Sequence, residues 1–237
     1  MVGRDLVIIP STTRSSAARS LTPMNISPKQ LIILLLAGGM FFVGRAAAQE
    51  APDILIKRVS EEVLAIAKTD KQIQAGNQER IMEVVRAKVL PHVNFQRMTQ
   101  LTAGRYWRDA TPEQQVALTN EFKALLIYTY AGAVAQIRNQ TLEFKPMRAA
   151  VDDTEVEVRT AVLQSRGEPI QLNYRLEKGP NGWKIVDVNI LGAWLVQTYR
   201  NSFAAEIQKG GMDGLIKTLA ERNKQLSASP PKPVIKN

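Results

Sequence analysis

The stretch that decides the fold is residues 111–138, which read TPEQQVALTNEFKALLIYTYAGAVAQIR. Thr111 suits a helix N-cap, Pro112 suits the first helical position, and Gln114 stands where a capping box uses Glu or Gln. Apolar residues then recur at helical spacing in two adjacent rows: Leu118, Phe122, Leu125 and Thr129, and Phe122, Leu126, Tyr130, Val134 and Ile137. The pattern predicts one long helix with an apolar face wide enough to need a large cover.

Shorter helices are predicted before this stretch. We expect a first helix that Asp53 caps and Gly76-Asn77 breaks. A second helix ends at Pro91, and a short third helix is capped by Asn94. The N-terminal part of the domain is therefore predicted to be helical.

After Asn139 the apolar period changes from 3.6 to 2. Apolar and polar residues alternate in residues 142–144, 155–160 and 170–177, and residues 183–190 form a fourth apolar segment. Turn signals separate the segments, the clearest being Gly179-Pro180-Asn181-Gly182. The sequence predicts an antiparallel meander of about four strands with one apolar face.

Helices are predicted again after the strands. Gly192 opens a helix, Gly210-Gly211 ends it, and residues 213–226 form a last short helix. The inward residues of the first of these helices are Leu195, Val196, Tyr199, Phe203 and Ile207. Helices, then strands, then helices indicate an α+β fold in which a curved sheet is covered by helices on one face.

A secretory signal peptide is predicted before the domain. Lys29 precedes an apolar run at residues 31–43, and Ala46-Ala47-Ala48 follows, which favours cleavage after Ala48. The run is shorter than the roughly 20 residues that span a bilayer as a helix. We expect export to the periplasm, and an uncleaved anchor helix is the alternative.

The predicted organisation has three parts. Residues 1–48 are an over-extended leader plus the signal peptide, with Met24 as the expected true start. Residues 49–226 form a single domain, which is long enough for a sizeable core. Residues 227–237 contain SPPKP and are predicted to be a disordered tail.

Composition excludes several function classes. Five of the 31 basic and one of the 22 acidic residues precede Gln49, so the mature chain has 26 basic and 21 acidic residues, a net charge of +5. These charges are interspersed, which argues against a nucleic-acid partner. The chain has no cysteine, which excludes disulfides, thiolate metal sites and cysteine nucleophiles.

The sequence offers few catalytic candidates. His92 is the only histidine, and it follows a helix-ending proline, where a structural role is expected. Asp152-Asp153 lies at a predicted turn, where Asp is expected for local backbone bonding. Asp187 interrupts an apolar strand, where an outward-facing or hydrogen-bonded aspartate is expected, and it is the candidate general base if the protein is an enzyme. We expect no metal and no cofactor.

Apolar surface is in excess, and two interpretations remain open. The sheet face and the helices can form an ordinary packed core. Alternatively they hold an apolar ligand between them, for which the small residues Ala131, Gly132, Ala133 and Ala135 would leave room. Under the second interpretation, bulky substitutions at Leu125, Thr129 and Ala133 block binding before they unfold the protein.

Five stretches of the sequence resemble the MlaC family, also called the toluene-tolerance family, of periplasmic phospholipid-binding proteins. They are residues 104–115 (GRYWRDATPEQQ), Phe122 to Tyr130, residues 182–190 (GWKIVDVNI), residues 192–203 with Leu195, Val196, Tyr199, Arg200 and Phe203, and residues 211–216. They occur in the family's order. One departure is Ala193-Trp194, where the family has slimmer residues, so that Trp194 is expected to narrow or reshape a cavity.

The resemblance implies a fold, a ligand and partners. The fold is an NTF2-like curved sheet covered by helices, with a small N-terminal helical part. The ligand is phospholipid, with acyl chains in a cavity and the head group near solvent. The partners are an outer-membrane lipoprotein–porin complex and an inner-membrane ABC transporter with an MCE-domain subunit, between which a monomeric shuttle maintains outer-membrane lipid asymmetry. A branch of the family is associated with hopanoids, which keeps that ligand class open.

The candidate site residues follow from the apolar faces and the resemblance. The lipid-binding candidates are Phe95, Met98, Leu101, Phe122, Leu125, Leu126, Thr129, Tyr130, Ala133, Val134, Ile137, Val158, Leu172, Tyr174, Val188, Ile190, Val196, Tyr199 and Phe203. The head-group candidates are Arg97, Arg105, Arg108 and Arg148. Three hypotheses stay open: a lipid carrier, an enzyme that uses Asp187, and a structural module of the envelope.

Overall fold

The computed structural model describes residues 49–228, except residues 148, 151 and 166. The predicted leader, signal peptide and tail lie outside the described residues, apart from the first two residues of the tail. Within the described range the chain forms an antiparallel sheet and two groups of helices. The α+β prediction is confirmed.

The sheet has five strands in the order β1-β2-β3-β4-β5, each antiparallel to its neighbour. They are β1 (Thr141–Phe144), β2 (Glu155–Leu163), β3 (Ile170–Gly179), β4 (Gly182–Ile190) and β5 (Ala193–Trp194). The first four are the predicted strands. The β3–β4 hairpin turns through Gly182 at φ 101°, a conformation that glycine adopts at little cost.

The fifth strand replaces the start of the predicted helix at Gly192. Leu191 and Gly192 both have positive φ, and the Asn189 side chain accepts a hydrogen bond from the Gly192 N–H at 2.9 Å. This turn folds Ala193–Trp194 back against the end of β4. The prediction was wrong here because a left-handed leucine is rare and no local pattern signals it.

The helices before the sheet begin with α2 (Pro52–Thr69). Asp53 does not cap it, because Pro52 already occupies the first helical position and Asp53 lies in the first turn. The short α3 (Lys71–Gln74) follows, and then α4 (Gln78–Val84), whose N-cap is Asn77. A π-helical turn η1 (Val85–Val89) and a 3-10 turn η2 (Leu90–His92) end this part.

The long helix is shorter than predicted. It follows α5 (Phe95–Ala103) and α6 (Tyr106–Asp109), and α7 itself spans Pro112–Tyr130, with the predicted capping box between Thr111 and Gln114 present. From Ala131 the chain tightens into the 3-10 segment η3 (Ala131–Gln136). This change coincides with the small residues around Gly132, which contribute little packing and, at the glycine, poor helix propensity.

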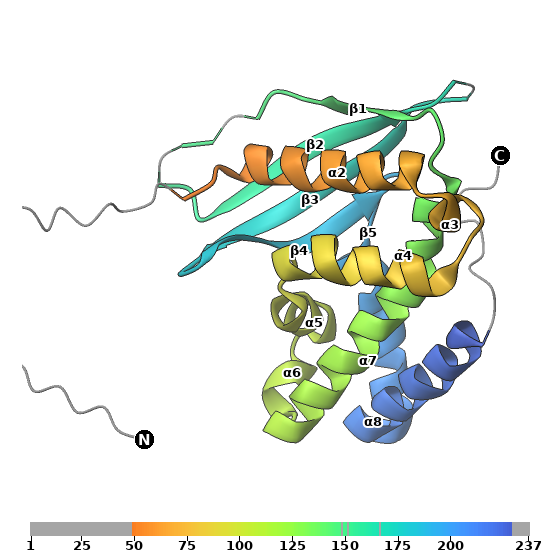
Figure 1. The fold of residues 1–237 in the computed structure, drawn as a ribbon. Coiled ribbons are helices and arrows are strands. Elements are labelled where there is room, and N and C mark those ends of the chain that lie inside the picture. Colours follow the sequence, from red (N-terminus) through yellow and green to blue (C-terminus); the bar gives the residue numbers. More distant parts are fainter. Residues whose placement is uncertain (1–48, 148, 151, 166, 229–237) are drawn as a thin grey trace, which may run out of the picture. The chain divides into compact units, whose positions relative to one another are not determined.

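The last helix, α8 (Leu195–Ser227), is interrupted at Gly211, which has φ 69°. The predicted break at Gly210-Gly211 is thus confirmed. Figure 1 shows α2 lying across the sheet and α7 and α8 in the helical part away from β1. Helices α5, α7 and α8 pack on one another, and α2 packs on the sheet.

Candidate functional site

The buried apolar residues form three separate clusters instead of one continuous core. The first joins α5, α6, α7 and α8, the second joins α2 to β2, β3 and β4, and the third joins the end of α2, α3, α4, η1 and η3. Most domains of this size have one contiguous core. The side chains between the clusters are half-buried, and Val188 packs against both the first and the second cluster.

On one face of the sheet, the burial of the side chains decreases from one residue pair to the next. The paired residues Leu176 and Ile185 are 0% and 4% exposed beneath α2. The next pair on this face, Tyr174 and Val188, is only half-buried, and so is the pair after it, Leu172 and Ile190. Helix α2 therefore seals one end of the sheet and leaves these two pairs incompletely covered.

The helices opposite change in the same way. On α7, Phe122 and Leu125 are 0% and 2% exposed, whereas Tyr130, at its end, is half-buried. Val134 and Ile137, in and just after η3, are also half-buried and pack against the third cluster. The predicted residues Thr129 and Ala133 have the same partial exposure.

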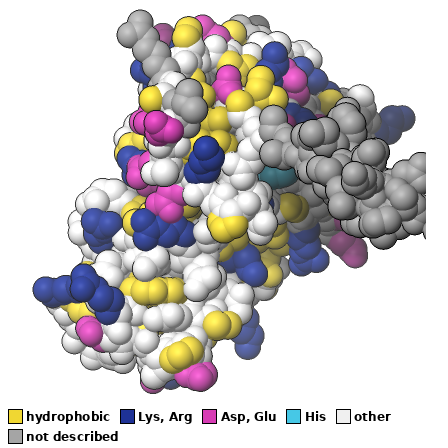
Figure 2. Space-filling view, turned by 90° about the vertical axis from the view of Figure 1, so that its left-hand side faces the viewer, with side chains coloured by type: hydrophobic (Ala, Val, Ile, Leu, Met, Phe, Trp, Pro, Cys, Tyr) yellow, Lys and Arg dark blue, Asp and Glu magenta, His cyan; other side chains and the backbone are white. Residues whose placement is uncertain are grey.

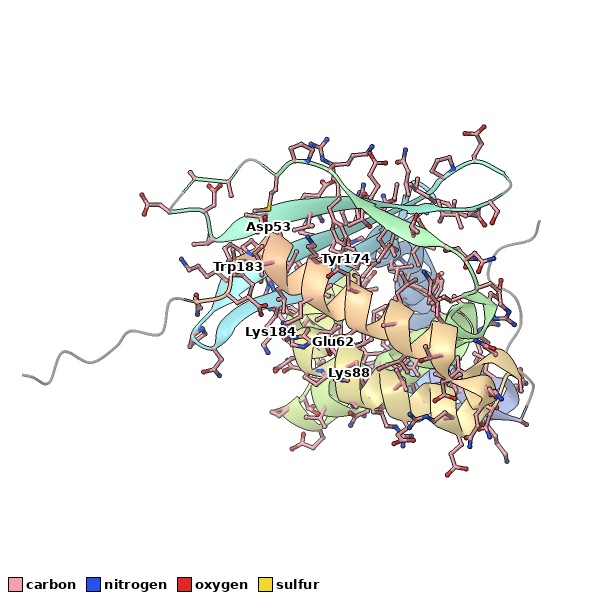
Figure 3. All side chains as sticks on the ribbon, turned by 45° about the horizontal axis from the view of Figure 1, so that its top comes forward. Asp53, Glu62, Lys88, Tyr174, Trp183 and Lys184 are labelled. Carbon is pink, nitrogen blue, oxygen red and sulfur yellow. The ribbon has the colours of Figure 1, made fainter. Side chains whose placement is uncertain are left out.

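Tyr174 shows that the half-buried side chains of the sheet lie on its α2-facing side. Burial raises the pKa of its phenol to about 12, while its side chain stays half-buried. The side chains of Ser60 on α2 and Thr160 on β2 lie near its hydroxyl. Tyr174 therefore lies under α2 with part of its side chain uncovered (Figure 3).

A second tyrosine pair lies nearby. Burial raises the pKa of Tyr130, and the phenol of Tyr199 on α8 lies near it. Tyr199 packs edge-on against Phe122, with ring centroids 5.2 Å apart. The two tyrosines therefore bring polar atoms into an otherwise apolar region.

The predicted lipid-binding residues thus fall into two sets. One set is fully buried in the first or second cluster: Met98, Phe122, Leu125, Leu126, Val158, Val196 and Phe203. The other set is half-buried around the clusters: Phe95, Leu101, Thr129, Tyr130, Ala133, Val134, Ile137, Leu172, Tyr174, Val188, Ile190 and Tyr199. The members of the second set on the sheet, at the end of α7 and in and just after η3 are the candidate binding surface.

Sequence reasoning missed the contribution of α2. Ser60 and Val63 are half-buried, whereas Leu55, Ile56 and Val59 one turn earlier are at most 7% exposed. The apolar row of this helix was visible in the sequence. What it covers was not, because its partners on β3 and β4 lie more than a hundred residues further along the chain.

The head-group candidates are not gathered at this surface. Arg97 forms an ion pair with Glu177 at 2.9 Å. Arg105 donates a hydrogen bond to the Tyr106 hydroxyl, and Arg108 is exposed on α6, which lies at the far end of the helical part from β1 (Figure 1). Arg148 lies outside the described residues. Figure 2 shows basic, acidic and uncharged side chains intermixed on one face.

Asp187 is a hydrogen-bonded strand residue, which was one of the two interpretations that the sequence left open. It is 1% exposed, and its Oδ1 accepts hydrogen bonds from the backbone N–H groups of Val188 at 2.8 Å and of Val196 at 3.0 Å. The Val196 bond holds the N-terminus of α8. Burial raises the pKa of the Asp187 carboxyl, and Arg175 lies 3.6 Å from its other oxygen.

Trp194 does not point into the candidate surface, contrary to the expectation that it narrows a cavity. It lies on β5, and the Arg175 guanidinium stacks over its ring at 4.4 Å. Arg175 pairs with Asp187, on the opposite face of β3 from Tyr174. The tryptophan therefore packs on the other side of the sheet.

Two further features lie apart from the candidate surface. His92 is in η2, where burial and the nearby Arg58 and Lys184 lower its pKa. An open hollow of about 550 Å³ is lined by Pro146, Met147, Glu157 and Arg159. Glu157 and Arg159 are exposed positions of β2, so this hollow is a charged surface feature.

In the described part of the chain, no group of three or more acidic or histidine side chains has an arrangement that could hold a metal ion. Within the same residues, no helix has the length and apolarity required to cross a membrane.

Comparison with known proteins gives three likenesses. A family model described as MlaC protein matches residues 57–221. The toluene tolerance protein ttg2D of Pseudomonas putida is 25% identical over 191 residues, which are 80% of this chain and 86% of that protein. A solved structure of the phospholipid-binding protein from Ralstonia solanacearum, in complex with a phospholipid, is 49% identical with a TM-score of 0.71, covering 75% of this chain and 99% of that one.

Proposed function

This chain belongs to the MlaC family, and from that premise we propose that it is a phospholipid carrier that holds acyl chains between the sheet, α2 and the end of α7. The similar Ralstonia protein is a phospholipid-binding protein whose structure contains a phospholipid. The proposal carries that ligand class over to this chain, whose fold matches it over most of its length.

The observation that carries the proposal is the change in burial along the sheet. Leu176 and Ile185 are sealed by α2, whereas the neighbouring pair Tyr174 and Val188 keeps free surface although both side chains pack against the buried clusters. A tightly packed core would bury both pairs alike. An acyl chain lying over Tyr174 and Val188 would complete the cover.

The energetics of transport require such a surface. At about 0.8 kcal/mol per CH₂ group, one sixteen-carbon chain in water costs on the order of 12 kcal/mol. The half-buried apolar side chains of β3, β4, α7 and η3 would replace that contact with water. No reaction is part of the proposal, and Asp187, the one candidate base, holds the start of α8 instead.

The cellular role is part of the same proposal. We infer that the protein is exported to the periplasm, takes up phospholipid there as a monomer, and carries it between an outer-membrane lipoprotein–porin complex and an inner-membrane ABC transporter with an MCE-domain subunit. Such a shuttle would maintain the lipid asymmetry of the outer membrane. Family membership and the likeness to a toluene tolerance protein support this role.

The test is the identity of the lipid that the protein retains. Protein purified gently from cells is extracted with organic solvent, and the extract is analysed by mass spectrometry. We expect phospholipid in the extract. Polycyclic hopanoids in its place would correct the ligand class, and lipid-free protein that also fails to bind a fluorescent phospholipid would refute the proposal.

A matched pair of variants locates the site. Val188→Trp fills the surface beside Tyr174, so it is expected to lower lipid occupancy several-fold while the far-ultraviolet circular dichroism stays unchanged. Val116→Trp makes the same change on α7 at a position that is 63% exposed, and it should leave occupancy unchanged. Equal occupancy in both variants would place the lipid elsewhere.

A further inference from the structure

The edge at which α2 meets η1 carries charged side chains of alternating sign. Arg58 of α2 donates hydrogen bonds to both carboxylate oxygens of Glu50, each at 2.8 Å. Arg58 also lies 3.5 Å from Glu62, one turn further along the same helix. Glu62 in turn forms an ion pair with Lys88 of η1 at 2.9 Å. Acidic and basic groups therefore follow one another along this edge.

Lys184 continues the series from the sheet. It lies in β4, and its Nζ donates a hydrogen bond to the carbonyl oxygen of Pro91 at 2.7 Å. Pro91 belongs to η2 and comes three residues after Lys88, so the Lys184 ammonium group is held close to the end of η1. Figure 3 shows Lys184, Glu62 and Lys88 on the same side of α2. We call Glu50, Arg58, Glu62, Lys88 and Lys184 the charged row.

Apolar side chains that keep free surface adjoin the charged row. Val63 directly follows Glu62, Val89 directly follows Lys88, and both are half-buried. Val93, just after η2, is half-buried as well and packs against both the first and the second cluster. The edge thus has charge at the surface and uncovered apolar area beside it. A phospholipid has the same division between its head group and its acyl chains.

The groups of the row are accessible to a ligand. The side chains of Arg58, Glu62 and Lys88 keep 42%, 37% and 41% of their surface exposed. Ion pairs at this exposure contribute little to stability, so they are exchanged easily for equivalent pairs with a bound molecule. Lys184 is bonded to a neutral carbonyl oxygen, which leaves its charge uncompensated at that contact.

The order of the signs favours one kind of head group. A phosphate that binds between Lys88 and Lys184 lies close to the carboxylate of Glu62, which repels it. A head group that carries an ammonium beside its phosphate removes this repulsion, because the ammonium meets Glu62. A primary ammonium donates up to three hydrogen bonds, whereas a fully methylated one has no N–H to donate. A glycerol head group brings no positive charge at all.

We propose that the charged row is a head-group subsite that prefers phospholipids with a phosphate next to a primary ammonium, such as phosphoethanolamine. The phosphate binds Lys88 and Lys184, and the ammonium binds Glu62. This inference rests on the proposed function, because the head group reaches the row only if the acyl chains lie against the adjoining apolar surface. The acyl chains supply most of the affinity, and the row sets a preference among head groups.

The experiment is a competition among matched lipids. Delipidated protein is incubated with vesicles that contain equal amounts of three phospholipids with identical acyl chains and with ethanolamine, choline or glycerol head groups. The lipid bound to the recovered protein is measured by mass spectrometry. We expect about two- to fivefold enrichment of the ethanolamine lipid over each of the others, the factor that one exposed ion pair provides. The enrichment should shrink at high salt.

A matched pair of variants assigns the ammonium contact. Glu62→Gln keeps the size of the side chain and removes its charge, so the ratio of ethanolamine to glycerol lipid should fall to about one. Glu61→Gln makes the same change at the exposed neighbouring position and should keep the wild-type ratio. The ratio compares lipids bound to one sample, so looser closure of the edge would change the total amount of lipid and not the ratio.

A second pair assigns the phosphate contact. Lys184→Gln keeps a donor for the Pro91 carbonyl oxygen and removes the charge. Offered phospholipid and diacylglycerol with the same acyl chains, this variant should bind at least about twofold less phospholipid relative to diacylglycerol than the wild type does. Lys57→Gln, at an exposed position of α2, should match the wild type.

The failures are distinguishable. If the wild-type protein binds the three phospholipids in equal amounts, the row does not select head groups and the carrier function stands. Ethanolamine enrichment that survives in Glu62→Gln, or an unchanged ratio of phospholipid to diacylglycerol in Lys184→Gln, also overturns the inference. If no lipid binds to the wild type, the proposed function fails and the inference fails with it.

Discussion

Asp187 illustrates what a single buried carboxylate does in this fold. One of its oxygens accepts hydrogen bonds from two backbone N–H groups, and one of these belongs to Val196 in the first turn of α8. An N–H group in the first turn of a helix has no partner within the helix, so an acceptor from the sheet fixes where α8 starts. The charged groups that face the carboxylate are Arg175 and Arg200.

Replacing Asp187 should reveal this role. Asp187→Ala leaves two N–H groups without their acceptor and is expected to lower the free energy of unfolding by about 1–3 kcal/mol. Asp187→Asn keeps an oxygen acceptor and should cost less. Urea unfolding measures both. Unchanged stability in the alanine variant would contradict the structural role, and a loss of some enzymatic turnover in the asparagine variant would revive the enzyme hypothesis.

The same carboxylate predicts a pH dependence. Because burial raises the pKa of Asp187, the folded protein binds this proton more tightly than the unfolded chain. The resulting stabilisation is fully present below the ordinary pKa of 3.8 and is lost as the pH rises through the folded value. The free energy of unfolding of the wild type, relative to Asp187→Asn, should therefore rise as the pH falls from 8 to 4.5. If the difference in unfolding free energy between the two proteins does not change with pH, the raised pKa of Asp187 is contradicted.

Substitutions at Leu125 and Ala133 distinguish a residue that packs the core from a residue of the proposed binding surface. Leu125 is 2% exposed within the first cluster, whereas Ala133 is half-buried in η3. Leu125→Trp should thus lower the free energy of unfolding by about 1–3 kcal/mol through overpacking. Ala133→Trp should keep most of the stability and lower the amount of bound lipid. Thermal unfolding and lipid extraction measure the two effects, and the reverse pattern would exclude η3 from the site.

At the scale of elements, α2 is held over the sheet in two different ways. Its first turns pack on Trp183 and Ile185 in the second cluster. Along its side, Glu62 forms an ion pair with Lys88 of η1 at 2.9 Å (Figure 3). It forms a second ion pair with Arg58 of α2 at 3.5 Å. Exposed ion pairs of this kind are weak and are screened by salt. The edge between α2 and η1 is therefore the less firmly closed side of the proposed site.

Reversing one charge tests this edge as the route for lipid. Glu62→Lys faces Lys88 and Arg58 with a like charge, so we expect release of a fluorescent phospholipid to vesicles to become several-fold faster. Glu61→Lys makes the same change of charge at the exposed neighbouring position and serves as the control. If both variants release lipid at the wild-type rate, the lipid leaves by another edge.

The elements also show where sequence reasoning succeeds and where it stops. The alternation of apolar and polar residues predicts β2 and β3 because one face of each is buried, and Thr111, Pro112 and Gln114 predict the start of α7 for local reasons. The end of α7 and the strand β5 depend on tertiary contacts, among them the turn at Leu191. Patterns within about four residues do not contain that information.

The candidate site was predicted only in part, because it too depends on tertiary contacts. Leu125 and Tyr130 belong to adjacent apolar rows of one helix, and both were expected to line a lipid site. Only the packing of α8 against α7 decides that Leu125 is sealed and that Tyr130 keeps free surface. Ser60 was overlooked because a serine within an apolar row looks like a tolerated polar residue until Tyr174 is placed opposite.

On the scale of the whole molecule, bound lipid is expected to act as part of the core. Three clusters that meet around half-buried side chains leave a region whose packing a ligand would complete. A ligand that binds only the folded state, at a free concentration of 100 times its Kd, stabilises by about 2.7 kcal/mol.

Removal of lipid should therefore lower the melting temperature by several degrees, and adding phospholipid back should restore it. Differential scanning calorimetry of extracted and reloaded protein measures this change. Val188→Trp, which is designed to fill the site, should show little response to added lipid. A melting temperature that is indifferent to lipid in the wild type would mean that the ligand adds nothing to the core.

The position of α2 in the chain has a consequence for the order of assembly. This helix is the first described element to leave the ribosome, yet Leu55, Ile56 and Val59 pack on Trp183 and Ile185, more than a hundred residues later. Contacts between such distant segments form late, because the intervening chain must first be ordered. The apolar face of α2 therefore stays uncovered until β4 has been synthesised, and during that interval it is open to contacts with other apolar surfaces.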